Sequence, residues 1–435
     1  MGLPPGRLCS LGGLPPHRGW SALSRVVDLF FEEFYEELER VVEGLRGRIE
    51  PKPLPAVVRM LRRRWRSYMP KPRGNEGVVI AVDGGVQSST FAYGGFAAVG
   101  RACALIYSGG ESSIVKRVKL YIGEAYDDAE REGITRYVRM IAEYSAAYEA
   151  VSGVLDEGGK PLLLMDGSLR PMGIPKRPSE YLHHPDLIAE LLGAIASLHA
   201  LSAKAGFPLT AIAKDSTALN IHIALLREIA EARGLIDLLR ELEAATPQRL
   251  QHLFRKLGDG AGDLAGALLC DTALVRESTR GEGYTIPLLL APPQQWRTPQ
   301  MIEGIDEETA RRIAEAMKLI LSQPGVASTI FRPQPESRPL RVDFLSTLIG
   351  YDEPWESYDI DGFIGDGSLA ELERLLDQLA YWFCNEVEYN IPLYQADLIA
   401  RFDRGLYESR YEPLIVSRLE AAGLSLLSRR RVLRL

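Results

Sequence analysis

The most constraining feature of this sequence is the segment VVIAVDGG at residues 78–85, where an apolar run ends in an aspartate and two glycines. Aspartate is depleted in strands, and an unpaired buried carboxylate is costly. Asp83 is therefore either a turn residue or a ligand. The segment LLLMDGSL repeats the pattern at Asp166. Because sites in open α/β sheets form outside the carboxyl ends of strands, we expect the two aspartates to lie close together.

The order of the predicted elements favours an α/β fold. Three strands come first, and the glycines within them indicate bulges or close backbone approach. A helix over 129–155, the strand that ends at Asp166, a helix over 185–205, a strand within 207–216 and a helix from 218 follow. We expect the first three strands to form an antiparallel meander and the later elements to alternate as parallel βα units.

The length of 435 residues allows two domains or one large α/β domain with insertions. Residues 1–20 are rich in glycine and proline and predict a disordered tail. Residues 21–73 predict a helical arm, because apolar residues recur in steps of three and four within 23–45. The main domain is expected at 74–435, with a helical insertion near 234–265.

Composition limits the setting in which the protein works. The four cysteines are far apart and form no CxxC pair, which argues against a structural zinc site or a disulfide framework and favours the cytoplasm. No apolar run predicts a membrane span. Since the formal net charge is −7, any surface that binds nucleic acid must be local. Arg62, Arg63 and Arg64 are the candidates, and a solvated helix face is the alternative for them.

Two neighbouring carboxylates repel each other unless a cation lies between them, and hard oxygen ligands suit Mg²⁺ or Mn²⁺. The structural alternative for each Asp-Gly pair is a turn. We expect a third carboxylate from the helix over 129–155, with Glu149 as the candidate and Glu143 as the competing choice. Lys214 ends the next strand and is either a phosphate ligand or a surface lysine. Glycine after each aspartate is expected to let a phosphate backbone approach.

These segments resemble the NurA nuclease family, which has a ribonuclease H-like fold. The stretches DGG, LLLMDGSL, AIAKDS and YNIPLYQADLIARF carry the resemblance, which extends over about residues 25–430. The resemblance implies a ribonuclease H-like mixed sheet and a metal-dependent DNA nuclease, with 5′–3′ exonuclease and single-strand endonuclease activity. It also implies two Mn²⁺ or Mg²⁺ ions held by Asp83, Glu149 and Asp166, and it matches the family tyrosine to Tyr389.

The chain departs from the family pattern at Asp397, where the family has a histidine. An aspartate is still an oxygen ligand for Mn²⁺ or Mg²⁺, so the replacement is compatible with activity. The implied ligand set is therefore Asp83, Glu149, Asp166 and Asp397, and Tyr389 is expected to contact the substrate.

The resemblance also implies partners. NurA proteins of archaea and bacteria resect DNA ends with the hexameric ATPase HerA, and this chain has no GxxxxGK[ST] loop of its own. We expect docking through an exposed loop at 352–367 that carries Trp355 and Phe363, with a packed loop and the N-terminal helix as alternatives. A homodimer is expected as well, because two subunits would line a shared channel with the arginines of 59–73.

Two other classes stay open. A phosphotransferase of the actin and sugar-kinase type also begins with a three-stranded meander, but it needs a second ββαβ half, which is not evident after residue 266. A non-catalytic adaptor of an ATPase ring would not need the acidic residues. DNA cleavage with Mn²⁺ separates the nuclease from both.

Overall fold

In the computed structural model the chain divides into two units, Met1–Lys52 and Pro53–Leu435. The helix α2 (Phe31–Leu45) is the described part of the first unit, within the amphipathic segment that the sequence predicts. The predicted tail and the part of the predicted insertion beyond residue 235 lie outside the described residues. The structure describes residues 31–45, 53–72, 77–91, 95–125, 127–170, 184–235, 269–293, 296, 305–365 and 369–424.

The helix α3 (Pro55–Arg64) belongs to the second unit, although the sequence analysis assigns it to the arm. It packs against α6 (Asn220–Ala232) and α9 (Asp271–Ser278), and Val57 and Leu61 are fully buried. The unit that contains the sheet therefore begins near residue 53 rather than 74, because the apolar face of α3 is part of its core.

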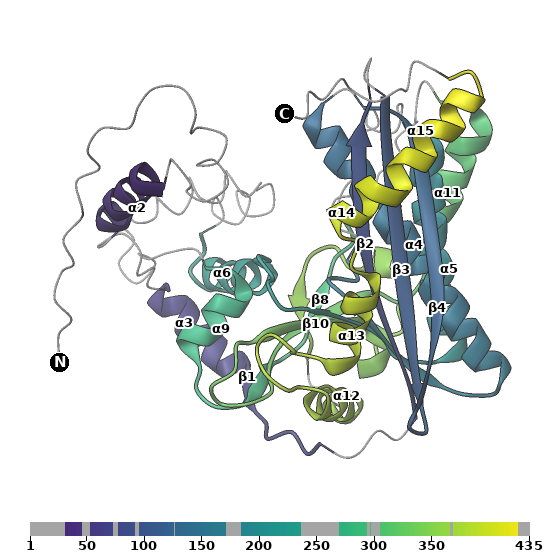
Figure 1. Cartoon of the computed structure of the whole chain (residues 1–435). Coiled ribbons are helices and arrows are strands. Elements are labelled where there is room, and N and C mark those ends of the chain that lie inside the picture. The colour runs from purple at the N-terminus through teal and green to yellow at the C-terminus, as the bar shows by residue number, and fades with distance from the viewer. Residues whose placement is uncertain are drawn as a thin grey trace, which may run out of the picture. The chain divides into compact units, whose positions relative to one another are not determined.

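A large mixed sheet forms the centre of the second unit (Figure 1). Its meander consists of β2 (Val78–Thr90), β3 (Gly95–Ser108) and β4 (Glu111–Glu124), which pair antiparallel. The strand β5 (Pro161–Asp166) pairs parallel with β2, and β6 (Leu209–Ala213) pairs parallel with β5. The meander and the parallel βα units are therefore arranged in the order that the sequence predicts.

The sheet continues beyond β6 with strands from the second half of the chain. The strand β10 (Leu340–Leu345) pairs antiparallel with β6, and β9 (Val326–Arg332) pairs antiparallel with β10. The strands β7 (Gly283–Thr285) and β8 (Leu288–Leu290) both pair with β9. Two short strands complete the sheet: β1 (Trp65–Ser67) on β7 and β11 (Gly362–Phe363) on β8.

Helices cover both faces of the sheet. The face with α4 (Asp128–Asp156), α5 (Pro185–Ala205) and α11 (Glu307–Ser322) receives the side chains of Ile80 and Val82. The other face, with α12 (Ala370–Tyr381) and α13 (Ile391–Ala400), receives Val79 and Ala81. The chain then continues through α14 (Arg404–Leu406), a π-helical turn (Tyr407–Tyr411) and α15 (Glu412–Ala421).

One helix in the described part of the chain, α5, is long and apolar enough to cross a membrane by length and composition alone. It packs against α4 and α11, and residues such as Leu191, Leu192 and Ile195 are fully buried. Its apolar character is therefore that of a core helix.

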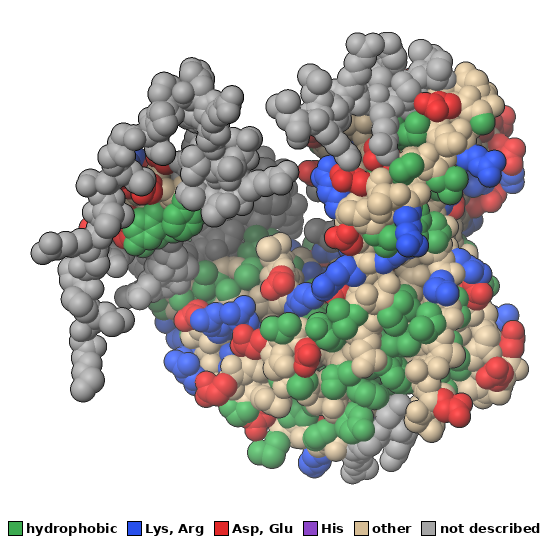
Figure 2. Space-filling view, in the orientation of Figure 1, with side chains coloured by type: hydrophobic (Ala, Val, Ile, Leu, Met, Phe, Trp, Pro, Cys, Tyr) green, Lys and Arg blue, Asp and Glu red, His purple; other side chains and the backbone are tan. Residues whose placement is uncertain are grey.

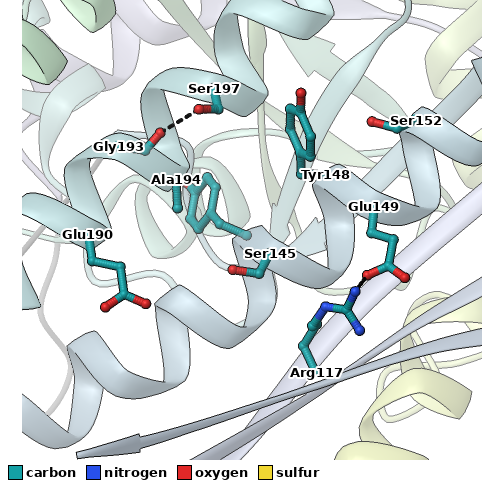
Figure 3. Close-up of a pocket in the computed structure, with 10 residues that line it drawn as sticks. Arg117, Ser145, Tyr148, Glu149, Ser152, Glu190, Gly193, Ala194 and Ser197 are labelled. Atoms are coloured by element: carbon teal, nitrogen blue, oxygen red, sulfur yellow. Dashed lines mark hydrogen bonds and ion pairs between the residues drawn. The ribbon is translucent and has the colours of Figure 1, made fainter.

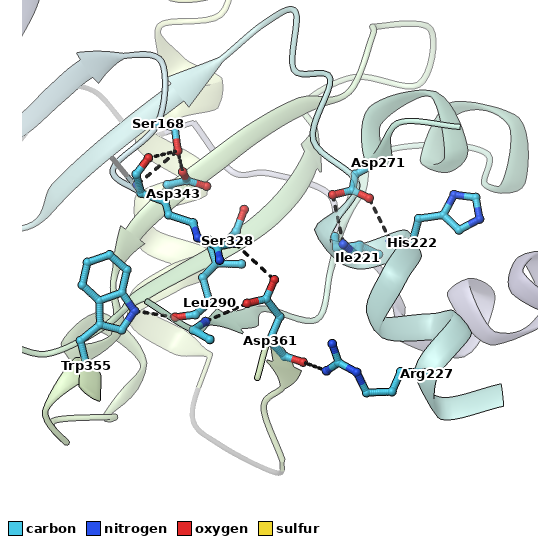
Figure 4. Close-up of polar contacts among 12 residues, drawn as sticks. Ser168, Ile221, His222, Arg227, Asp271, Leu290, Ser328, Asp343, Trp355 and Asp361 are labelled. Atoms are coloured by element: carbon cyan, nitrogen blue, oxygen red, sulfur yellow. Dashed lines mark hydrogen bonds and ion pairs between the residues drawn. The ribbon is translucent and has the colours of Figure 1, made fainter. Parts of the chain in front are cut away.

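The segment 352–365 packs on the domain through Trp355, so the expectation that this tryptophan is exposed for docking is wrong. Trp355 is fully buried, and its indole Nε1 donates to the carbonyl oxygen of Leu290 at 2.6 Å (Figure 4). The carboxylate of Asp361 accepts a hydrogen bond from the backbone N–H of Ala291 at 2.8 Å. The strand β11 pairs with β8, Ile364 is buried, and Tyr358 and Phe363 are half-buried, whereas Ile360 is 48% exposed.

Candidate functional site

Asp83 and Asp166 lie side by side on neighbouring strands. Asp166 is the last residue of β5, whereas β2 continues beyond Asp83 to Thr90, so the alternative that Asp83 is a turn residue is wrong. Val82 is in register with Met165 across the parallel pair β2 and β5, and each aspartate is the next residue of its strand. Neighbouring strands are about 4.8 Å apart. Side chains alternate along a strand, so Asp83 points to the α13 face together with Val79 and Ala81. The structure therefore brings the two predicted aspartates together, and Asp83 is buried while Asp166 is exposed.

The helix α13 adds a third carboxylate to this end of the sheet. It packs on β2 and β3, and the side chain of Asn390 caps its first turn by accepting from Leu393 N at 3.1 Å. Asp397 lies on this helix and forms an ion pair with Arg401 at 3.0 Å. The charge of Asp397 contributes to the raised pKa of Asp83, which places it in the electrostatic field of the same site.

Tyr389 and Lys214, which are far apart in the sequence, lie beside the aspartates. The hydroxyl of Tyr389, a buried residue, donates to Oδ1 of Asp166 at 2.8 Å. Lys214, which follows β6 and is exposed, has its Nζ 5.0 Å from the centre of the Tyr389 ring. Tyr389 therefore contacts Asp166 directly, and Lys214 lies on the ring of this tyrosine.

The fourth carboxylate is Glu143, so the expectation that Glu149 joins the aspartates is wrong. Glu143 lies on α4, is buried, and has Arg139 at 3.5 Å. Its charge interacts with those of Asp83 and Asp166. Glu149 is 44% exposed and pairs with Arg117 of β4. It lines a separate cavity of about 660 Å³ between α4 and α5 (Figure 3).

A sequence signal for Glu143 was present. Glu143 lies in one stripe of α4 with Ala147, Ala150 and Val154, in steps of four, three and four, and all of these residues are buried. Glu149 lies in a stripe with Ser145, Ser152 and Asp156, and each of these residues is half-buried or exposed. The carboxylate that continues a buried stripe is the one that reaches the site. From here on, Asp83, Glu143, Asp166 and Asp397 are called the carboxylate cluster.

The two glycines after Asp83 admit protein atoms rather than a phosphate backbone. A Cβ atom on Gly84 would lie 2.6 Å from Oε1 of Glu143 and 2.8 Å from its Cγ. A Cβ atom on Gly85 would lie 2.5 Å from the carbonyl oxygen of Ala400 and 2.9 Å from the amide nitrogen of Phe402. Gly84 therefore makes room for Glu143 on one face of β2, and Gly85 makes room for the end of α13 on the other.

The glycine after Asp166 has a different function. Gly167 has a φ of 108°, which lies in the region that side chains rarely adopt, and no atom lies near the position of its Cβ. This glycine allows the chain to turn directly after Asp166.

Burial and neighbouring negative charges make Asp83 and Glu143 hard to ionise. The pKa of Asp83 is raised to about 7, first by burial and then by the charge of Asp166, with a smaller contribution from Asp397. Burial raises the pKa of Glu143 to about 7 as well, while Arg139 acts in the opposite direction. Burial and the charge of Asp166 raise the pKa of Tyr389, so its hydroxyl stays a hydrogen-bond donor.

The donor chemistry of the cluster fits a hard divalent cation. Buried carboxylates that raise one another's pKa gain most from a positive charge between them. In the described part of the chain, no three acidic, histidine or cysteine side chains are already drawn together around one point as in a complete ligand shell. The carboxylate of Asp166 is turned towards Tyr389 and that of Asp397 towards Arg401. Cation binding at this cluster therefore requires side-chain rotation.

The arginines of α3 lie elsewhere. Arg62 donates to the carbonyl oxygen of Ser278 at 3.0 Å, and Arg64 pairs with Glu228 at 2.7 Å. Arg63 lines a small cavity of about 210 Å³ between α3 and α6. Within the described ranges, no contact joins these three arginines to the carboxylate cluster. Nucleic-acid contact through them stays a prediction.

Comparison with known proteins agrees with the resemblance seen in the sequence. The NurA domain model matches residues 77–394, and this chain therefore belongs to the NurA family. No curated protein matches the chain.

Three solved structures are similar. The NurA nuclease from Sulfolobus solfataricus is 13% identical, with 91% of this chain and 98% of that chain covered and a TM-score of 0.48. A NurA structure with manganese is 15% identical, covering 91% and 98% of the two chains, with a TM-score of 0.41. A NurA structure bound to dAMP and manganese is 14% identical, covering 91% and 97%, with a TM-score of 0.40.

Proposed function

We propose that this protein is a metal-dependent DNA nuclease with a ribonuclease H-like core. The convergence of the carboxylate cluster at the carboxyl end of β5, beside the middle of β2, carries the proposal. The strand order β4-β3-β2-β5-β6, with a meander followed by two parallel strands, supports the ribonuclease H-like architecture. Membership of the NurA family supports nuclease activity. A sugar-kinase-type phosphotransferase or a non-catalytic adaptor gives no reason for four acidic side chains at this place.

The cluster would hold two Mn²⁺ or Mg²⁺ ions through Asp83, Glu143, Asp166 and Asp397. Such ions neutralise a phosphate and supply a nucleophilic water. Asp83 and Glu143 each hold a proton near neutral pH, which a cation would displace. Tyr389 orients the carboxylate of Asp166. Lys214, exposed beside that tyrosine, provides positive charge for a phosphate oxygen.

A matched pair of substitutions on one helix tests the assignment of the glutamate. Glu143→Gln is expected to lower Mn²⁺-dependent cleavage of a labelled DNA end by about a hundredfold or more, since it removes a charged ligand. Glu149→Gln, the same change on the exposed side of α4, is expected to stay within about twofold of the wild type. Equal rates for the two variants would contradict the assignment, and absence of cleavage by the wild type would contradict the proposed function.

The type of cleavage, the process and the partner are inferred from the resemblance to the NurA family. We propose 5′–3′ exonuclease and single-strand endonuclease activity in DNA-end resection, with a HerA-type hexameric ATPase as the motor. The helix α2 is the remaining docking candidate, because Phe31, Phe34 and Tyr35 are each more than half exposed. Phe34→Glu is expected to abolish co-purification with such a hexamer and to leave cleavage by the isolated chain unchanged. Co-purification at the wild-type level would exclude α2 as the contact.

We also propose a homodimer. The arginines of α3, on which the sequence analysis based the dimer, do not support it, because Arg62 and Arg64 are bound within the chain. Exposed apolar side chains support it instead. Hydrophobic side chains gather on the face that carries α13 and the lower part of the meander (Figure 2). Among the exposed apolar side chains are Ile114, Val118 and Leu120 on β4 and Leu398 on α13, of which Val118 is 62% exposed. Patches of this kind mark interfaces.

Light scattering tests the dimer. The wild type is expected to have twice the chain mass at micromolar concentration. Val118→Asp, which places a charge in the patch, is expected to have the mass of one chain, whereas Ser113→Asp on the same strand is a control for added charge. A wild type that scatters as a monomer would refute the dimer.

A further inference from the structure

A buried ion pair lies on β10, next to the carboxylate cluster. Arg341 donates from Nε to Oδ1 of Asp343 at 2.8 Å and from Nη2 to Oδ2 at 3.0 Å. Arg341 is 5% exposed and Asp343 is 0% exposed. Buried ion pairs contribute little net stability compared with apolar side chains of similar volume, because both charges lose their hydration. General stabilisation therefore does not explain why this ion pair is buried, and a specific role is to be sought in the groups that it contacts.

Asp343 also accepts hydrogen bonds from the turn that follows Asp166. The hydroxyl of Ser168 donates to Oδ2 of Asp343 at 2.6 Å, and the backbone N–H of Leu169 points to the same oxygen at 3.3 Å (Figure 4). Gly167 N donates to the carbonyl oxygen of Ile212 on β6 at 2.9 Å. Three consecutive residues after Asp166 are thus bound to β6 and to β10, the next strand beyond it.

Ser168 is the centre of this arrangement. Besides donating to Asp343, its oxygen accepts from the backbone N–H of Arg170 at 3.2 Å and from Nη2 of Arg341 at 3.4 Å. The turn needs this support because Gly167 has a positive φ and makes no side-chain contact of its own. Without the hydroxyl, the turn would keep only the longer contact of the Leu169 N–H with the ion pair, while the ion pair itself remained.

We infer that Ser168, Asp343 and Arg341 position the backbone of Asp166 so that its carboxylate can reach the proposed cation site. This inference rests on the proposed function and names positioning residues rather than further ligands. Tyr389 fixes the carboxylate end of Asp166 by its hydrogen bond, and Ser168 fixes the chain that follows it. Substitutions of groups that orient metal ligands commonly change metal affinity or activity by about tenfold to a hundredfold.

Ser168→Ala is the informative variant, because it deletes one hydroxyl and leaves the buried charges paired. Ser202→Ala is the matched control: Ser202 is 2% exposed and donates to the carbonyl oxygen of Phe207 at 2.8 Å, on the C-terminal turn of α5. Both variants lose one short hydrogen bond that the hydroxyl donates, and Ser168→Ala also loses two longer ones that it accepts. A merely structural effect would lower the thermal midpoint of both variants without changing Mn²⁺ affinity. Ser168→Thr retains the hydroxyl and tests rescue.

Four measurements on the full chain decide the inference: Mn²⁺ affinity by calorimetry, kcat and KM for a labelled DNA end, the thermal midpoint, and metal-free hydrogen exchange at residues 167–170. For Ser168→Ala we expect about tenfold weaker Mn²⁺ binding, about tenfold lower kcat, a nearly unchanged KM and faster exchange in the turn. Ser202→Ala should match the wild type in all but the thermal midpoint, and Ser168→Thr should recover most of the affinity.

The inference is overturned if Ser168→Ala and Ser202→Ala agree in Mn²⁺ affinity, kcat and exchange of the turn. A failure of the proposed function is distinguishable from this outcome, because it would appear in the wild type as absence of both Mn²⁺ binding and cleavage. That result would overturn the inference together with the function.

Discussion

Asp83→Asn is expected to abolish DNA cleavage and, without divalent cations, to make the folded protein more stable above pH 7. The loss of activity follows from the burial of Asp83 and from its interaction with the charges of Asp166 and Asp397 in the carboxylate cluster, which is the proposed cation site. We expect cleavage to fall by about a thousandfold or more, on the order of 4 kcal/mol of activation free energy.

The gain in stability follows from the pKa of Asp83, which is about 7 in the folded protein and 3.8 in its ordinary state. The folded protein therefore binds this proton more tightly than the unfolded chain does, and the free energy of unfolding falls as the pH rises from about 4 to about 7. Asparagine removes this pH-dependent loss. The variant should match the wild type near pH 4 and exceed it at pH 8 by on the order of 1 to 3 kcal/mol.

Urea unfolding in EDTA at several pH values measures this difference. Glu143 titrates in the same pH window, so the wild-type curve should keep some slope in the Asp83→Asn variant. Addition of Mn²⁺ should reverse the order, because the cation stabilises the wild type more strongly. A variant that is less stable than the wild type at pH 8 in EDTA would show that the pKa of Asp83 is not raised in the folded protein.

Gly84→Ala and Gly85→Ala are expected to fail in different ways, although they are neighbours. The methyl group added at position 84 would meet the carboxylate end of Glu143, which can swing aside, so cleavage should fall about a hundredfold with little change in stability. The methyl group added at position 85 would meet backbone atoms of Ala400 and Phe402. Because backbone cannot swing aside, we expect a loss of about 1 to 3 kcal/mol and a displaced α13.

The control for both glycine variants is Gly153→Ala on α4, where a Cβ would meet no atom within 4 Å. Alanine is the better helix former, so this variant should be as stable as the wild type or more so. A double-mutant cycle of Gly84→Ala with Glu143→Gln should be strongly non-additive in kcat, since both changes remove the same carboxylate from the site. Additive losses would mean that Gly84 acts on something other than Glu143.

The local pattern of the sequence was sufficient to predict the meander, the parallel strands β5 and β6, and the meeting of Asp83 with Asp166. The apolar runs define the strands, and parallel neighbours necessarily have their carboxyl ends at the same edge. Tyr389 and Asp397 were placed by resemblance to the NurA family, since their pattern alone does not predict which helix packs on β2.

The tertiary structure decided which acid of α4 enters the site. Glu143 and Glu149 lie on the same helix, and the rotation of α4 on the sheet buries the first and exposes the second. The tertiary structure also decided the burial of Trp355. The sequence predicts this residue in an exposed docking loop, but its ring is buried beside β8. Burial depends on which surface faces the segment, and a local pattern does not contain that surface.

The glycines and the buried ion pair illustrate the physical limit most clearly. Gly84 and Gly85 are explained by atoms of Glu143, Ala400 and Phe402, and Ser168 is explained by Asp343, which is 175 residues away in the chain. Periodicity predicts the conformation of a segment because it reflects contacts within a few residues. The reason for a small residue or a buried charge lies in atoms contributed by distant segments, and only folding brings those atoms into contact.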